Sequence, residues 1–178
     1  MASDDISSAT DNVTKSKRLL ETFSSGDVGV ADELLDPQAI NHDPALPAAI
    51  RSLREPETFK RTVSMYRTAF PDLQMIVDDA MADGDKVALR WHAEGTHRGE
   101  LQGLAPTGKR GSVTGIAIYQ WRDGKVVETW TQWDNLGLAR QLGAAPPEGS
   151  IGERLGWASS ALLRAACASR PPARCRAR

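Results

Sequence analysis

The sequence predicts an α+β fold in which helices come first and an antiparallel sheet follows. The first half carries apolar residues at helical spacing. The second half holds four β-rich runs, "LQMIVDDAMA", "KVALRWHAEGTH", "GSVTGIAIYQW" and "KVVETWTQW", separated by "DGD", "GLAPTGKRG" and "RDG". Asp-Gly between such runs is a strong hairpin signal, because glycine accepts the positive φ angle of a tight turn. A block of helices followed by a block of strands is typical of α+β rather than alternating βαβ folds.

The first two helices are predicted from spacing and from their stops. Residues 13–23 carry Val13, Leu19, Leu20 and Phe23 near helical spacing, and Ser24 to Gly26 close this helix. A short second helix over 28–35 must stop before Pro37, because the residue before a proline is pushed out of helical geometry.

The remaining elements follow in order. Residues 39–44, "AINHDP", predict a brief strand that ends in an Asx-Pro turn. From Pro56 to Phe70, the residues Phe59, Val63, Tyr66 and Phe70 recur at i, i+4, i+7 and i+11, which marks one face of a helix. After the four strands, "NLGLARQLG" predicts a last helix. A curved sheet with helices on one face leaves a pocket between the two layers.

The chain divides into one domain with two flanking segments. We expect a disordered leader over 1–12, a single domain over 13–143, and a C-terminal extension over 144–178. The extension reads as a linker, a short amphipathic helix and a basic tail. With 178 residues, the chain is long enough for one substantial core.

Composition excludes several classes of function. The formal net charge is −1, from 22 basic and 23 acidic residues, so no overall field favours nucleic acid or an acidic membrane. No apolar run approaches the ~20 residues that span a bilayer, and the N-terminus lacks a secretory signal. Cys167 and Cys175 form neither a CxxC pair nor a Cys/His cluster, and no HxH or HExxH pattern occurs, so we expect a cytoplasmic protein without a metal.

Asp134 is the main candidate for chemistry. On an extended strand, Trp130, Gln132 and Asp134 share one face, and if that face is concave the carboxylate lies in the pocket. An apolar surround would raise its pKa and make it a base strong enough to remove a proton from carbon. The alternative is that Asp134 is the N-cap of the following helix.

The other candidates are the histidines and one arginine. His42, His92 and His97 could donate a hydrogen bond to an enolate oxygen or deliver a proton, although each could instead bond a backbone carbonyl. Arg90, next to Trp91, could anchor a carbonyl or carboxylate, but such an arginine more often pairs with an acid on a neighbouring strand.

The residues from about Val13 to Gly143 resemble the SnoaL-like polyketide cyclases, also called ester cyclases, of the NTF2-like superfamily. The resemblance rests on "NHDP", "AFPD", "GTHRGE", "PTGK", "DGK" and the closing "WDNLGLARQLG". It implies a cone-shaped α+β barrel with a curved sheet wrapped around helices and a deep pocket, commonly as a homodimer.

The resemblance also implies chemistry. It implies a cofactor-free and metal-free aldol cyclisation of an apolar or aromatic polyketide-like substrate, with Asp134 as acid/base and with His97 and His42 as second candidates. We expect six residues to contact the substrate: Trp130, Gln132, Arg90, Trp91, His92 and Tyr66.

Two other functions fit the same fold. Epoxide hydrolases of this superfamily use two aspartates bridged by an arginine, but His92 stands where the second aspartate would follow Arg90. A ligand-binding module without catalysis is the third possibility, since an aromatic pocket also suits storage of an apolar molecule.

Overall fold

The structure, a computed structural model, describes residues 2–152, with the side chains described from residue 9 onward. Its elements, in chain order, are α1 (Ala2–Ser25), α2 (Gly29–Leu34), β1 (Leu35–Asn41), α3 (Ala48–Arg51), α4 (Glu57–Ala69), β2 (Gln74–Asp83), β3 (Lys86–Thr96), β4 (Arg110–Arg122), β5 (Lys125–Trp133) and α5 (Asn135–Leu142). The amphipathic helix expected from Ile151 lies outside the described residues except for its first two positions, and the basic tail lies wholly outside them.

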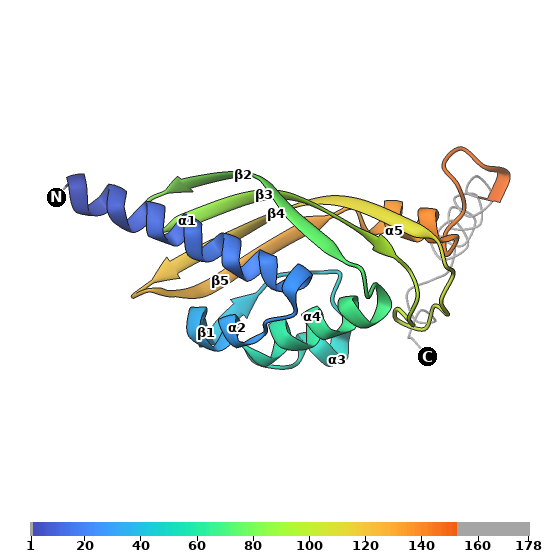
Figure 1. The fold of residues 1–178 in the computed structure, drawn as a ribbon, viewed down its shortest axis with the longest axis horizontal. Coiled ribbons are helices and arrows are strands. Elements are labelled where there is room, and N and C mark those ends of the chain that lie inside the picture. Colours follow the sequence, from blue (N-terminus) through green and yellow to red (C-terminus); the bar gives the residue numbers. More distant parts are fainter. Residues whose placement is uncertain (1, 153–178) are drawn as a thin grey trace, which may run out of the picture.

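The five strands form one open, curved sheet in the order β1-β5-β4-β3-β2. β1 pairs in parallel with β5, and the other pairs are antiparallel. Figure 1 shows α1, α2 and α4 gathered on one face of this sheet, with α5 at the end of β5. The predicted α+β class and the curved sheet with a helical layer are confirmed, and the sheet does not close into a barrel.

The core fills the space between the sheet and the helices. Apolar side chains from the helices and the strands build it: Leu19, Leu20 and Phe23 of α1, Ala31 and Leu34 of α2, Val63 and Ala69 of α4, and inward-facing strand residues such as Leu89 and Tyr119. A buried hydrogen bond of 3.0 Å from Trp121 Nε1 to Ser16 Oγ ties β4 to α1. The helical layer is therefore held by both apolar burial and a satisfied polar contact.

Two differences from the predicted elements have simple causes. α1 begins at Ala2 and so runs through the segment expected to be a disordered leader, because propagating a helix from a packed segment adds one hydrogen bond per residue fixed. β1 begins at Leu35 and contains Pro37, which an edge strand tolerates since one side of it lacks a partner strand.

Candidate active site

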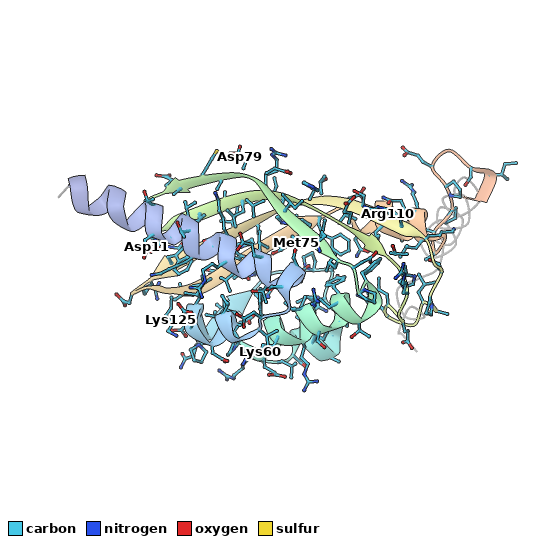
Figure 2. The ribbon with its side chains drawn as sticks, in the orientation of Figure 1. Asp11, Lys60, Met75, Asp79, Arg110 and Lys125 are labelled. Carbon is cyan, nitrogen blue, oxygen red and sulfur yellow. The ribbon has the colours of Figure 1, made fainter. Side chains whose placement is uncertain are left out.

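A cavity of about 110 Å³ lies between the sheet and the helical layer. Figure 2 shows Met75, one of its lining residues, on the side of β2 that faces α1. Most of the lining is apolar, and it comes from every layer of the fold: Leu20, Phe23, Leu35, Leu46, Phe59, Phe70, Leu73, Met75, Trp91, Ala93, Val113, Trp133 and Leu138. Such a surface favours a flat or apolar ligand.

Three polar side chains form a hydrogen-bonded network in the wall of this cavity. Asn41, at the end of β1, donates from Nδ2 to Glu55 Oε1 (3.0 Å) and accepts from the Asp43 backbone N–H (2.9 Å). Glu55 Oε2 accepts from the Phe59 N–H in the first turn of α4 (3.1 Å). Asp43 Oδ1 accepts from the Ala45 N–H (2.8 Å). The network fixes two carboxyl groups in an apolar site.

Both carboxyl groups are buried, with Asp43 8% and Glu55 5% exposed. Burial raises the pKa of Asp43, and the hydrogen bond from Ala45 opposes that change. Burial also raises the pKa of Glu55, against hydrogen bonds from Asn41 and Phe59. Each group therefore holds a proton more tightly than a solvated carboxyl and is a stronger base when ionised.

Two buried hydrogen-bond donors also belong to the cavity wall. The Tyr66 hydroxyl and Trp91 Nε1 are both shielded from solvent, and among residues 2–152 neither has a hydrogen-bond partner. Burial, and then the charge of Asp43, raises the pKa of Tyr66, so its hydroxyl stays protonated. A buried donor without an acceptor is costly, and a ligand oxygen would remove that cost.

The comparison with known families decides the class of protein. The family described as SnoaL-like polyketide cyclase matches residues 14–142. The chain belongs to the SnoaL-like polyketide cyclase family.

Its relatives include aklanonic acid methyl ester cyclases. AcmA of Streptomyces galilaeus is 29% identical over 135 residues, which cover 74% of this chain and 90% of that protein. DauD of Streptomyces sp. strain C5 is 31% identical over 137 residues, with 74% and 81% covered. The resemblance predicted from the sequence and the cyclase class of enzyme are confirmed by these matches.

Solved structures agree with this assignment. TsrD from Streptomyces laurentii superimposes with a TM-score of 0.64 at 29% identity and covers 74% of this chain and 97% of its own. IdmH from Streptomyces antibioticus gives a TM-score of 0.60 at 33% identity, with 76% and 98% covered.

In this cyclase-family protein, the face of β5 that carries Trp130 and Gln132 does not line the cavity, and the expectation that it does is wrong. Thr129, Thr131 and Trp133 line the cavity, so Trp130 and Gln132 lie on the opposite face of the sheet. The pairing of β4 with β5 shifts register between Gln120 and Trp121, which inserts one extra residue into β5 after Val126. A bulge of this kind reverses which side chains point inward beyond it.

Asp134 is exposed and does not line the cavity. Its Oδ1 accepts a hydrogen bond from the Gly137 N–H (2.7 Å), which makes it the N-cap of α5. The expected position in an apolar surround is therefore wrong, and the alternative interpretation as a helix cap is confirmed. An acid/base role for Asp134 stays a prediction without support from its surroundings.

The histidine candidates of the two motifs also lie away from the cavity lining. His42 is exposed, contacts Glu128 Oε1 through Nε2 (2.7 Å) and stacks on Trp130 at 5.3 Å between ring centroids. His97 is fully buried, and its Nδ1 accepts from the Thr107 N–H (3.2 Å). Their positions suit roles in packing and in fixing a loop.

Arg90 and His92 meet on the outer face of the sheet. Asp78 accepts from Arg90 Nη1 (3.0 Å) and contacts His92 Nδ1 (2.7 Å). The prediction that Arg90 pairs with an acid on a neighbouring strand is confirmed, and that acid is Asp78 of β2. Of the six residues expected to contact substrate, Trp91 and Tyr66 line the cavity and the other four do not.

The sequence reading missed the polar network of Asn41, Asp43 and Glu55. One signal was present, because Asn41 and Asp43 alternate with Ile40 and His42 at the end of a strand, and only one of these sets can face inward. Glu55 carried no such signal, since it lies in a loop whose path the sequence does not specify.

Metal binding and membrane insertion can be considered for the described residues. Across residues 9–152, no cluster of three or more His, Cys, Asp or Glu side chains is placed to hold a metal ion. Within the same range, none of the helices is both long and apolar enough to traverse a bilayer.

Proposed function

We propose that this protein catalyses the intramolecular aldol cyclisation of an apolar, polyketide-like carbonyl compound by proton transfer. The cavity supports this proposal, because it combines an apolar lining with buried carboxyl groups that bind protons tightly. The observation that carries it is the pair of carboxyl groups in the cavity wall.

The chemistry needs little more than such a carboxyl group. A carboxylate takes the proton from a carbon next to a carbonyl, and the electron pair of the C–H bond becomes an enolate. The enolate carbon attacks a second carbonyl carbon of the same molecule, which the cavity holds nearby. The new alkoxide then receives the proton back from the carboxylic acid. The product is an isomer of the substrate.

Aklanonic acid methyl ester is the substrate class that the curated relatives suggest, because they are named as cyclases of this ester. Incubation of the ester with the purified chain, followed by chromatography and mass spectrometry, tests the proposal. We expect a product of unchanged mass and different retention. Recovery of bound ester with no conversion would overturn the proposal and favour a binding module.

A pair of variants on adjacent residues tests whether the cavity is the site. Val113 lines the cavity, whereas Thr114 is exposed on the opposite face of β4. Val113→Phe should fill the cavity and abolish turnover, while Thr114→Phe should preserve it. Overpacking of this kind costs about 1–3 kcal/mol, so far-ultraviolet circular dichroism must show that both variants fold. Equal turnover in the two variants would place the reaction elsewhere.

The epoxide hydrolase alternative gains no support from the geometry. The Arg90–Asp78 pair lies on the outer face of the sheet. The second partner of Asp78 is His92, so the pair is not the arginine-bridged pair of aspartates that those hydrolases use.

A homodimer completes the proposed assembly. The helices cover one face of the sheet (Figure 1), and the opposite face carries Ile76 on β2 and Ile116 on β4, which are 50% and 51% exposed. β2 and β4 flank β3 in the sheet, and partly exposed isoleucines on a face that no described helix covers suit contact with a second copy of the chain.

A further inference from the structure

We propose that Asp43 is the proton-transferring group of this site and that the Tyr66 hydroxyl donates the hydrogen bond that stabilises the enolate oxygen. This inference rests on the proposed function and names the residues that carry it out.

The two buried carboxyl groups differ in their hydrogen bonds. Both oxygens of Glu55 are occupied, one by Asn41 Nδ2 and the other by the Phe59 N–H, so this side chain ties β1 to the first turn of α4. Asp43 uses only Oδ1, in the turn to Ala45. Its Oδ2 accepts no hydrogen bond within the described part of the chain, and it remains available to a substrate. Glu55 is thus a positioning residue, and Asp43 is the catalytic residue.

Two hydrogen bonds fix the position of Asp43. Asn41 holds the Asp43 backbone N–H through Oδ1, and the Ala45 N–H holds the carboxyl group itself. The Oδ2 lone pairs are therefore presented from a fixed main chain and a fixed rotamer. Such preorganisation avoids the cost of reorienting the base at the moment of reaction.

Tyr66 lines the same cavity as Asp43. The Tyr66 ring packs edge-on against Trp133, with 6.0 Å between centroids, which fixes the phenol in the cavity wall. Asp43 and Tyr66 both line this cavity, and burial, followed by the charge of Asp43, raises the pKa of Tyr66. The hydroxyl has no acceptor among residues 2–152 and can donate to a ligand. Enolate formation needs a base that removes the proton and a donor that binds the carbonyl oxygen of the same substrate.

The reaction balances with these two groups alone. Asp43 Oδ2 takes the proton as the substrate C–H bond breaks, and the electron pair moves to the carbonyl oxygen, which accepts a hydrogen bond from Tyr66. The new C–C bond forms as the second carbonyl becomes an alkoxide. The Asp43 carboxylic acid then returns its proton to that alkoxide, and the site is restored.

Turnover of the methyl ester by matched variants tests the assignment. Asp43→Asn keeps the acceptor for the Ala45 N–H and removes the base, so we expect kcat to fall by about 10²-fold or more. Tyr66→Phe should lower kcat by about 10-fold or more through loss of the donor. Asp134→Asn should leave turnover unchanged, because its carboxyl group caps a helix outside the cavity. Full turnover by Asp43→Asn would overturn the assignment of Asp43. If Asp134→Asn were inactive in the same assay, the proposed cyclisation would still hold, with a different catalytic residue.

A binding measurement with 2-naphthol does not depend on turnover. This flat phenol resembles an enol, and we expect its oxygen to lie between Asp43 and Tyr66. An ionised Asp43 accepts the naphthol O–H in a charge-assisted bond, so affinity should rise as the pH rises through the raised pKa of Asp43. Asp43→Asn should remove this pH dependence, and Tyr66→Phe should weaken binding about 10-fold.

The other titratable groups that line the cavity are Glu55, Glu94 and Tyr119. Glu94 is paired with Arg110 (2.7 Å), and Glu55→Gln serves as the control for the second buried carboxyl. A pH dependence that survives in Asp43→Asn and disappears in Glu55→Gln would overturn the assignment. Naphthol binding that behaves as expected, together with an ester that is never converted, would retain the site and reject the reaction.

Discussion

At the scale of single residues, the chemistry depends on the few polar atoms that the apolar cavity contains. Asn41 links Asp43 and Glu55, because its Nδ2 donates to Glu55 Oε1 and its Oδ1 accepts from the Asp43 backbone N–H. The hydrogen bonds of the two carboxyl groups nevertheless give them different roles. A carboxylate whose oxygens both accept hydrogen bonds is stabilised as a structural group. One with a free oxygen can exchange a proton with a ligand. The difference between the two residues is therefore set by local geometry.

Glu55 should make the stability of the protein depend on pH. Burial in the folded protein raises its pKa above that of a solvated glutamate, against hydrogen bonds from Asn41 and Phe59. Between the unfolded and the folded pKa, the folded state binds more protons than the unfolded state. The free energy of unfolding therefore falls as the pH rises through this window, and the stabilisation is complete only below the unfolded pKa.

The measurement is denaturant unfolding from about pH 4 to about pH 7. We expect Glu55→Gln to flatten the decline, because the amide does not titrate. Glu57→Gln, on the exposed face at the start of α4, is the control and should keep the slope of the parent protein. A slope that Glu55→Gln leaves unchanged would show that Glu55 titrates alike in both states.

At the scale of elements, the last helix depends on its cap. Asp134→Ala removes the acceptor for the Gly137 N–H and should lower the free energy of unfolding by about 1 kcal/mol, whereas Asp134→Asn should cost little because asparagine also caps well. Both variants should retain turnover. Equal stability of the two variants, measured by denaturant unfolding, would show that the cap contributes nothing.

Gly115 allows β4 to pass two tryptophans of the cavity wall. A Cβ at this position would lie 2.4 Å from Trp91 Cζ2 and 2.8 Å from Trp133 Cβ, closer than real Cβ contacts. Gly115→Ala should therefore displace the wall, lower stability by about 1–3 kcal/mol and reduce turnover. Gly152→Ala, where the nearest atom in the described part of the chain is Pro146 Cβ at 3.5 Å, is the matched control. Thermal unfolding of both variants checks this, and a Gly115→Ala protein as stable as the control would refute the close approach.

The sequence predicted the elements better than it predicted the site. The four strands and α4 follow from local patterns, since periodicity and Asp-Gly turns act over a few residues. The face of β5 that lines the cavity depends on a bulge, which pairing with β4 determines and which the pattern of β5 alone does not reveal. The expectation for Asp134 depended on the face that it shares with Trp130 and Gln132 being concave, and Thr131 and Trp133 line the cavity instead. Glu55 was missed because a loop placed it beside Asn41, a contact between distant segments.

At the scale of the whole molecule, the described helices cover one face of the sheet and leave the other face open. The covered face holds the cavity, and the open face carries Ile76, Ile116 and the polar cluster around Asp78. In Figure 2, Asp79 lies on the side of β2 away from the helices, whereas Met75 lies toward them. The two faces therefore serve different purposes, one for substrate and one, on our proposal, for a second subunit.

A charge on the open face should separate the subunits. Ile116→Lys places an ammonium group in the proposed apolar contact, where burying an unpaired charge is costly, so we expect a monomer. Leu53→Lys changes an exposed leucine on the helical side and should leave a dimer. Sedimentation equilibrium measures the masses of both variants and the parent chain. A monomeric parent, or an unchanged dimer of Ile116→Lys, would contradict this interface.

The most direct test of the central claim is a crystal structure of the Asp43→Asn protein with the methyl ester bound. If proton transfer occurs in the cavity, the ester lies between the sheet and α4, with a carbonyl oxygen within hydrogen-bond distance of the Tyr66 hydroxyl. The carbon that loses its proton should then face residue 43. An ester bound on the outer face of β5, beside Trp130, Gln132 and Asp134, would contradict the claim.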